Sequence, residues 1–371
     1  MKEHKWDILY IVGLVGFTAY LALDTFLIPG VYQSDATEMN LSAFEAAAKQ
    51  VQSEESGPED ANAKAAMTGK EADGKTPAAA DQSGEKTTAN ADQTAGKTQS
   101  SAHKKRPGSG NRQRQKEREA GSSESVTTKQ ASASDSYQDE NMAITLTEYT
   151  TNDTKVYVAD VKLSSAQYLK TAFAQDTYGK NVTDETSAIA KEHNAILTVN
   201  GDYYGARNTG YVIRNGIVYR DEPSDADLLC IYADGSMKIT DQSSVSASQL
   251  AEEGVWQAFS FGPALLTDAQ IAVTQDEETG KAMASNPRTA IGIIDDLHYL
   301  FVVSDGRTDE SAGLSLYELA DFMKQLGVKT AYNLDGGGSS TMVFQGRVIN
   351  QPTTTGNSIK ERKVSDIVYI G

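Results

Sequence analysis

One segment of the chain combines a carboxylate, three glycines and hydroxyl groups at a spacing that suits the binding of a polar or anionic group. Residues 333 to 341 read Asn-Leu-Asp-Gly-Gly-Gly-Ser-Ser-Thr and follow a short apolar strand pattern. Glycine loses more backbone entropy on folding than other residues, so three together are expected where side chains would obstruct a ligand. We expect the bare N–H groups of the loop and the acid Asp335 to cradle an anion.

Familiar templates for such a loop do not fit. A P-loop needs a lysine after its last glycine, but Ser339 follows Gly338. A serine nucleophile elbow needs a final glycine two residues after the serine, where Thr341 stands. His193 and His298 lie outside the candidate loops, which disfavours a Ser-His-Asp triad and a histidine-rich zinc site. Carboxylate chemistry assisted by arginine remains, and it suits glycosyl or phosphoryl substrates.

Three further polar loops follow strand patterns. They are Asn200–Asp202, Asn286–Thr289 and Ser304–Arg307. Taken singly, each is ordinary turn chemistry, because Asn-Gly and Asp-Gly pairs are common in turns. Taken together with the glycine loop, they bring three carboxylates and two arginines to one domain, which indicates a functional site.

These loops carry a resemblance to the phosphodiester glycosidase family, which includes bacterial proteins of exopolysaccharide biosynthesis. The matching motifs are Asn286–Gly292, Ser304–Arg307, Leu316–Ala320 and Asn333–Thr341, in that order. Asn200–Tyr204 resembles the upstream Asn-Gly-x-aromatic-aromatic loop of the family. The resemblance covers the chain from about Ala195 onward and implies hydrolysis of a sugar-1-phosphodiester at its sugar–phosphate linkage.

The resemblance and the chemistry together assign expected roles. Arg288 is expected to pair with phosphate oxygens, and Asp335 to stabilise the oxocarbenium-like centre or to act as base or nucleophile. The residues expected to be catalytic are Asp335, Arg288, Asp202 and Asp305. Those expected to bind substrate are Asn200, Thr289, Arg307, Asn333, Gly336, Gly337, Gly338, Ser339 and Thr341.

Other interpretations of these residues stay open. Asp335 could accept N–H bonds from its own loop, and Glu318 fits a capping box with Ser315. The carboxylates could hold Ca²⁺ or Mg²⁺, although their spacing matches no EF-hand, and no cofactor is required by the pattern. The single cysteine, Cys230, lies in an apolar run and is expected to be a small buried hydrophobe.

Many strand patterns and few helix patterns follow residue 139. Alternating or apolar runs predict strands at 142–149, 155–163, 195–199, 211–214, 217–219, 229–232, 236–239, 256–261, 289–294, 297–304, 330–334, 341–344, 347–349 and 366–370. Helices are expected from Ser164 to Ala174, from Thr183 towards His193, and from Ser315 to Leu326. The pattern predicts an α+β domain, residues 139–371, with a large mixed or antiparallel sheet and a few packed helices.

The residues before this domain divide into two parts. Residues 33–138 are rich in small and polar residues and poor in aromatic and branched aliphatic ones, which predicts a disordered linker. Residues 1–32 contain an apolar run, Ile8–Leu23, preceded by Lys2 and Lys5, which predicts a single transmembrane anchor with a cytoplasmic N-terminus. A cleaved signal peptide is the alternative, disfavoured by the length of the run and the lack of a small-x-small site.

The functional prediction combines these parts. The formal net charge of −17 argues against general nucleic-acid binding. A basic cluster in the linker, around His103–Arg106, is a solvated tether or a contact to anionic wall polymer or lipid. We expect a hydrolase at the cell membrane, with its catalytic domain extracytoplasmic, acting on a glycosyl-phosphodiester of a cell-surface or extracellular anionic glycopolymer. The alternative is a non-catalytic glycopolymer-binding or assembly protein on the same fold.

Overall fold

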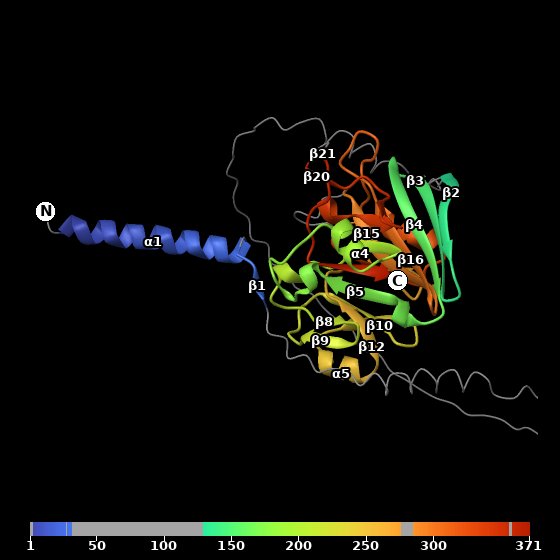
Figure 1. Ribbon diagram of the computed structural model, residues 1–371, viewed down its shortest axis with the longest axis horizontal. Coiled ribbons are helices and arrows are strands. Elements are labelled where there is room, and N and C mark those ends of the chain that lie inside the picture. The colour runs from blue at the N-terminus through green and yellow to red at the C-terminus, as the bar shows by residue number, and fades with distance from the viewer. Residues whose placement is uncertain (1–2, 27, 32–128, 276–284, 356–357) are drawn as a thin grey trace, which may run out of the picture. The chain divides into compact units, whose positions relative to one another are not determined.

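The computed structural model describes residues 3–26, 28–31, 129–275, 285–355 and 358–371 (Figure 1). The predicted linker lies outside the described residues up to residue 128. Its last ten residues form a strand, β2 (Lys129–Gln138), so regular structure begins before the predicted boundary at residue 139.

The largest sheet has eight strands in the order β14-β13-β17-β15-β16-β4-β3-β2. Besides β2, its strands are β3 (Met142–Thr151), β4 (Thr154–Leu163), β13 (Ala264–Thr267), β14 (Gln270–Ile271), β15 (Arg288–Asp295), β16 (His298–Ser304) and β17 (Thr330–Asn333). Strands β15 and β17 lie side by side, with Ala290 opposite Asn333. This pairing brings the start of the Asn286–Thr289 loop close to the start of the glycine loop.

Two five-stranded sheets accompany it. One has the order β19-β18-β7-β22-β5 and consists of β5 (Leu169–Phe173), β7 (Leu197–Asn200), β18 (Met342–Phe344), β19 (Arg347–Val348) and β22 (Asp366–Ile370). The other has the order β11-β10-β12-β8-β9 and consists of β8 (Val212–Arg214), β9 (Ile217–Arg220), β10 (Asp227–Tyr232), β11 (Met237–Asp241) and β12 (Val255–Phe259). Two-stranded pairs join β1 (Gly30–Val31) to β6 (Gly179–Lys180) and β20 (Thr353–Thr355) to β21 (Ser358–Ile359).

Every strand pairing between the described residues is antiparallel. The helices are few: α1 (Glu3–Phe26), α4 (Thr186–Glu192), α5 (Ala247–Glu252), α6 (Leu316–Gln325) and the 3-10 turns η1 (Ala166–Tyr168), η2 (Ala174–Asp176), η3 (Tyr204–Ala206) and η4 (Gly337–Ser339). The α+β prediction is therefore confirmed in its antiparallel form, with several sheets in place of one large sheet.

A central core lies between the three main sheets. Alternate residues of one strand face different apolar clusters, as β16 shows: Tyr299, Phe301 and Val303 enter the central core, whereas Leu300 and Val302 pack beneath α6. In the same way α4 and α5 cover the outer faces of the two five-stranded sheets. Burial on both faces explains why these strands read as continuous apolar runs and not as alternating ones.

Local turn and cap signals predicted several elements correctly. Asn215 and Gly216 adopt the positive φ values of a hairpin turn between β8 and β9. Ser315 and Glu318 form the capping box that opens α6, and Gly327 follows its end with φ +85°. Cys230 is fully buried, and burial raises the pKa of its thiol to about 12, so the prediction of a buried hydrophobe is confirmed.

The helix predicted from Ser164 to Ala174 is wrong. Only the single turn η1 forms, capped by Ser165, and residues 169–173 form strand β5. The reason is long-range: β5 pairs along its whole length with β22 at the end of the domain. The helix predicted from Thr183 begins later, as α4, at Thr186.

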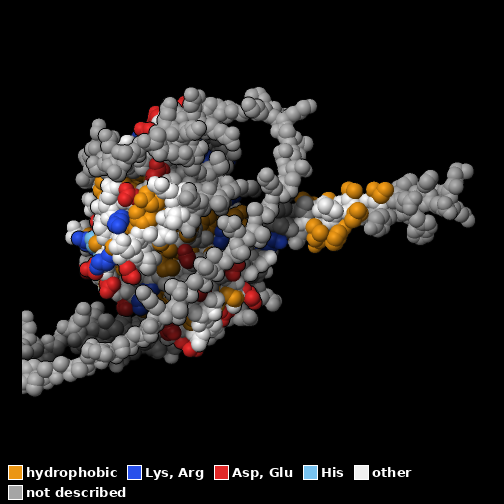
Figure 2. All heavy atoms as spheres, turned by 180° about the vertical axis from the view of Figure 1, so that it is seen from behind, with side chains coloured by type: hydrophobic (Ala, Val, Ile, Leu, Met, Phe, Trp, Pro, Cys, Tyr) orange, Lys and Arg blue, Asp and Glu red, His pale blue; other side chains and the backbone are white. Residues whose placement is uncertain are grey.

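The apolar N-terminal run forms the helix α1, and its described side chains, such as Ile11, Val12 and Val15, are exposed (Figure 2). Over the residues that the structure describes, no helix has both the length and the apolar character needed to cross a membrane. The transmembrane part of the prediction is therefore not supported by the structure.

Candidate active site

A pocket of about 980 Å³ opens among the loops that follow β7, β12, β16 and β17 and those that precede β15 and β22. Five cationic side chains line it: Arg207, Arg288, Arg307, Arg362 and Lys363. Among its described lining residues, Asp335 is the one carboxylate. In a chain with a formal net charge of −17, this pocket gathers positive charge and so suits an anionic ligand.

The glycines permit close approaches around Asp335. Gly337 has φ +62°, and a Cβ added there would lie 2.9 Å from Nη2 of Arg307. A Cβ at Gly338 would lie 2.8 Å from the Cα of Thr354. The N–H groups of Gly337 and Ser339 are donated to the carbonyls of Pro287 and Gly336. The expected N–H cradle is therefore not formed by these two groups, and the side chains around the loop supply the positive charge.

Arg362 holds the loop and its carboxylate in place. Its Nη2 donates to Oδ2 of Asp335 at 2.8 Å and to the carbonyl of Gly336 at 3.1 Å, and its Nε donates to Oγ of Ser339 at 2.8 Å. The Asp335 side chain is only 10% exposed, whereas that of Arg362 is 42% exposed. Arg362 therefore pairs with the nearly buried carboxylate of Asp335 while part of its own side chain stays exposed in the pocket.

Two predicted arginines also line the pocket. Arg288 is almost fully buried, and its Nε donates to the carbonyl of Leu314 at 2.9 Å. Arg307 donates from Nε and Nη2 to Oδ1 of Asn286 at 3.1 and 2.9 Å. Burial and the charge of Arg362 lower the pKa of Arg307 from its ordinary value, and both side chains line the pocket. An anion between them would relieve that repulsion.

Two buried polar atoms in the pocket wall lack partners among the described residues. Asn333 donates from Nδ2 to the carbonyl of Gly262 at 2.8 Å, but its Oδ1 accepts no hydrogen bond. The hydroxyl of Ser365 is likewise unpaired. Both residues line the pocket and are at most 3% exposed. Because an unpaired buried polar group costs about 1–3 kcal/mol, these two atoms are candidates for hydrogen bonds to a ligand.

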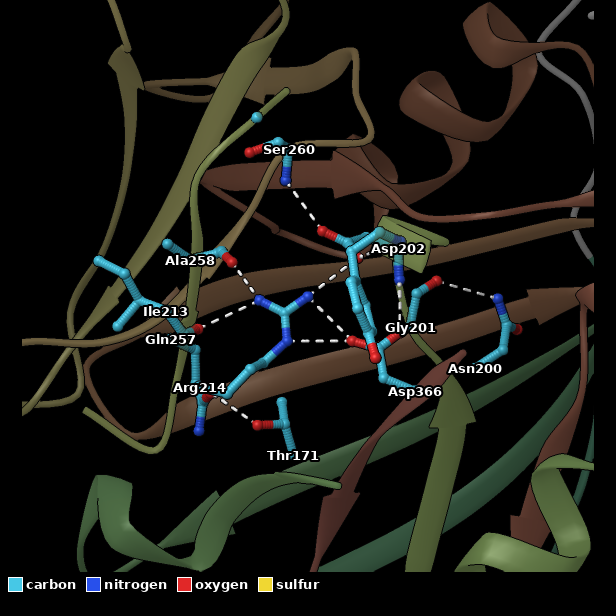
Figure 3. A network of polar contacts seen from close by, with 12 residues as sticks. Thr171, Asn200, Gly201, Asp202, Ile213, Arg214, Gln257, Ala258, Ser260 and Asp366 are labelled. Atoms are coloured by element: carbon cyan, nitrogen blue, oxygen red, sulfur yellow. Dashed lines mark hydrogen bonds and ion pairs between the residues drawn. The ribbon is translucent and has the colours of Figure 1, made fainter. Parts of the chain in front are cut away.

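Asp202 and Asp305, both predicted to be catalytic, do not line the pocket. Asp202 is buried in an ion cluster with Arg214 and Asp366 (Figure 3). Asp305 accepts hydrogen bonds from the hydroxyl of Tyr157 at 3.2 Å and the N–H of Gln351 at 2.7 Å. Burial raises the pKa of Asp305 above its ordinary value. Only Asp335, of the three predicted carboxylates, reaches the pocket.

Most of the other predicted substrate-binding residues lie outside the pocket lining and belong to the glycine loop or to the hydrogen-bonded network around it. Asn200 donates from Nδ2 to the carbonyl of Asp335 at 2.7 Å, and its Oδ1 accepts from Thr289 at 2.8 Å and from the N–H of Thr341 at 3.3 Å. These three residues, with Gly338 and Ser339, are buried and lie outside the pocket lining. Arg307, Asn333, Gly336 and Gly337 do line it.

Several pocket residues were not singled out from the sequence. Arg362 and Lys363 belong to a short basic run before β22, which was the available signal. Arg207 donates to the carbonyl of Ser260 at 3.0 Å and lies 5.0 Å from the ring centre of Phe261. Tyr203 is 40% exposed at the pocket wall. The described residues contain no group of three or more His, Cys, Asp or Glu side chains that could share a metal ion.

The class of protein follows from comparison with known families. Residues 193–371 match the family model described as phosphodiester glycosidase, so this part of the chain is similar to that family. The matched region contains all five cations of the pocket and Asp335.

Individual relatives are more distant. The chain is 28% identical over 181 residues to the SPbeta prophage-derived uncharacterized protein YomE of Bacillus subtilis, covering 47% of this chain and 28% of that protein. It is 37% identical over 87 residues to mouse N-acetylglucosamine-1-phosphodiester alpha-N-acetylglucosaminidase, covering 22% of this chain and 17% of the enzyme. The chain therefore spans less than a third of the length of these relatives.

A solved structure shares the fold. The catalytic domain of zebrafish N-acetylglucosamine-1-phosphodiester alpha-N-acetylglucosaminidase, auto-inhibited by its pro-peptide, matches with a TM-score of 0.50 at 19% identity. The match covers 66% of this chain and 88% of that structure. The sheet-rich fold with several antiparallel sheets and few helices is thus that of this catalytic domain.

Proposed function

We propose that this chain hydrolyses the bond between a sugar and a phosphate in a glycosyl-1-phosphodiester and releases the free sugar. One observation carries the proposal: five cationic side chains line a pocket that contains a single carboxylate among its described residues. The match of residues 193–371 to the phosphodiester glycosidase family model supports the same class of reaction.

The cations account for the phosphate half of the substrate. Arg288, Arg307 and Arg362 all line the same pocket. A guanidinium binds two oxygens of one phosphate through parallel N–H donors, so this group would hold the phosphodiester and its developing charge. Lys363 adds a further positive charge at the pocket wall.

The unpaired polar atoms account for the sugar half. Oδ1 of Asn333 can accept a hydrogen bond from a sugar hydroxyl or amide, and Oγ of Ser365 can donate or accept one. The exposed ring of Tyr203 offers an apolar face for the sugar ring. These groups line the pocket together with Asp335.

The chemistry needs one carboxylate because the leaving group is a phosphomonoester. The bond between the anomeric carbon and the bridging oxygen breaks, and its electron pair stays on the phosphate, where the cations stabilise it. Water supplies hydroxyl to the anomeric carbon and a proton to the base or to the phosphate. Ordinary glycosidases need a second carboxyl group as acid, but a phosphate leaves without strong protonation. Asp335 then serves as base or nucleophile.

The test measures sugar release by the full-length chain from a panel of sugar-1-phosphodiesters. Hydrolysis in ¹⁸O-water should place the label in the sugar, because the bond from carbon to oxygen breaks. Label in the phosphate would show cleavage between phosphorus and oxygen and would refute this reaction. Binding of an anionic glycan without turnover over long incubation would instead favour a non-catalytic glycopolymer-binding protein.

We further propose that the substrate belongs to a cell-surface or extracellular glycopolymer and that residues 1–32 anchor the chain in a membrane. This proposal rests on the apolar run Ile8–Leu23, on the lysines before it and on the cationic pocket. Protease digestion of intact and lysed cells tests it: the domain should be cut in intact cells and stay with the membrane after alkaline washing. Complete release by the wash would refute the anchor.

A further inference from the structure

A buried ion cluster joins Arg214 to Asp202 and Asp366, whose sequence neighbours Tyr203 and Ser365 line the pocket (Figure 3). Arg214, at the end of β8, donates from Nη2 to Oδ1 of Asp202 at 2.9 Å and from Nε and Nη2 to Oδ2 of Asp366 at 3.0 and 2.9 Å. Its Nη1 donates to the carbonyls of Ile213 and Ala258. All three charged side chains are at most 3% exposed.

Burying three charged side chains in a core has a large desolvation free energy. Removing charges from water costs several kcal/mol per ion, and well-packed apolar residues of similar volume are often at least as stabilising. Here two carboxylates share one guanidinium, so one negative charge is left over when all three groups are ionised. Stability alone therefore does not explain the arrangement.

The carboxylates bond to the backbone of the segments that form the pocket wall. Oδ1 of Asp202 accepts from the N–H of Tyr204 at 3.2 Å, and its Oδ2 accepts from the N–H of Ser260 at 3.1 Å. The neighbouring residues Tyr203 and Phe261 line the pocket. Tyr203 is held at φ +62°, a backbone conformation that a bulky residue rarely adopts. The side chain of Asp202 therefore holds two backbone segments, at Tyr204 and at Ser260, next to residues of the pocket wall.

Asp366 extends the same connection to Asp335. Its Oδ1 accepts from the N–H of Asp202 at 3.2 Å, and its carbonyl accepts from the N–H of Gly201 at 2.9 Å. A Cβ added at Gly201 would lie 2.1 Å from Oδ1 of Asp366, so the loop packs against the carboxylate with no space between them. The carbonyl of Gly201 in turn accepts from the N–H of Asp335 at 3.2 Å.

We infer that Arg214, Asp202 and Asp366 are positioning residues that hold Tyr203, Phe261 and Asp335 in the geometry the pocket needs. The catalytic part of this inference rests on the proposed function, whereas its structural part does not. Asp202 then acts through the backbone it holds, not by contact with substrate.

The test compares Asp366→Asn with a matched control in the same part of the fold. Gln257 is buried on β12 and bonds to Leu169, Thr171 and Asn215, none of which lines the pocket. Figure 3 shows its bond to Thr171. Gln257→Leu therefore disturbs a buried polar network without touching the pocket wall. Arg214→Lys, which keeps the charge but not the forked donors, is the second variant if Asp366→Asn does not fold.

The first readout is hydrogen exchange without substrate. The hydrogen-bonded amides of Asp202, Tyr204, Ser260 and Asp335 should exchange at least about tenfold faster in Asp366→Asn than in the wild type, and should be unchanged in Gln257→Leu. Equal effects in the two variants, or no local change in either Asp366→Asn or Arg214→Lys, would overturn the inference.

The second readout is the split between kcat and KM. Because a displacement of about 1 Å lowers rates about 10²-fold, Asp366→Asn should lower kcat by about that factor with little change in KM. Gln257→Leu should keep the wild-type kcat per folded molecule. A wild-type protein without hydrolase activity would refute the proposed function, but the exchange measurement would still decide the positioning role.

Discussion

Replacing Arg362 with glutamine tests the arrangement of the pocket most directly. The change removes the ion pair to Asp335 at 2.8 Å, the bond to the carbonyl of Gly336 at 3.1 Å and the bond to Ser339 at 2.8 Å. It keeps a polar side chain, although a shorter one, so the pocket loses one fixed positive charge and the hydrogen bonds of the guanidinium.

The expected loss of stability is small and the expected loss of activity is large. The Arg362 side chain is 42% exposed, and partly exposed ion pairs contribute only about 0.2–1 kcal/mol to folding. In the proposed reaction the same guanidinium would orient Asp335 and face the developing phosphate charge. Removing one such donor from a preorganised site costs about 2.7–4 kcal/mol of transition-state stabilisation, which is about 10²–10³-fold in rate.

The assay measures kcat/KM on a sugar-1-phosphodiester beside the free energy of unfolding in urea. Arg347→Gln is the matched control, because Arg347 is 60% exposed, pairs with Asp135 and lies outside the large pocket. The control should lose a similar small amount of stability and keep full activity. An Arg362→Gln enzyme that keeps more than about a tenth of wild-type kcat/KM would contradict the reasoning, since even the smaller expected effect is about 10²-fold.

Three further outcomes are expected. Asp335→Asn should lower kcat about 10²–10⁴-fold with no loss of folded protein, as initial rates and circular dichroism will show. Asn333→Ala removes the unpaired Oδ1 and should raise KM about tenfold, the effect of one lost hydrogen bond, while an unchanged KM would place the sugar elsewhere. Asp366→Asn should flatten the pH dependence of stability. Burial and the charge of Asp202 raise the pKa of Asp366 to about 7, despite its pairing with Arg214. The folded state therefore keeps this proton longer than the unfolded chain, whose pKa is near 3.8. The contribution of this proton to the free energy of unfolding is complete below pH 3.8, the pKa of the unfolded chain. That contribution is lost as the pH rises through about 7, the pKa of the folded state. Urea unfolding at several pH values checks this, and an identical pH dependence in the variant would refute it.

The fold could be predicted from sequence where local chemistry decides it. The Asn215-Gly216 turn and the Ser315 capping box each need only a few neighbouring residues, and both form as predicted. Residues 169–173 show the opposite case, because their conformation depends on pairing with residues 366–370. No signal within that segment indicates its distant partner.

The types of residue in the site could be predicted from the sequence, but only some of the individual pocket residues could be. Asp335 and Arg288 lie in loops whose spacing pointed to a site, and both line the pocket. Sequence spacing does not show which way a side chain points, so Asp202 could not be distinguished from a pocket residue before its bonds to Arg214 were known. Arg362 reaches Asp335 only because the segment before β22 folds over the glycine loop.

The position of β22 has a consequence for how the protein assembles. This strand lies between β7 and β5, in the interior of its sheet, yet it is the last strand of the described chain. Until residues 366–370 are available, the facing edges of β7 and β5 have no partner and the ion cluster lacks Asp366. Contacts between such distant segments form slowly, and open strand edges attract chaperones or other chains. The pocket is therefore among the last parts of the fold that can be completed, because its wall depends on residues next to β22.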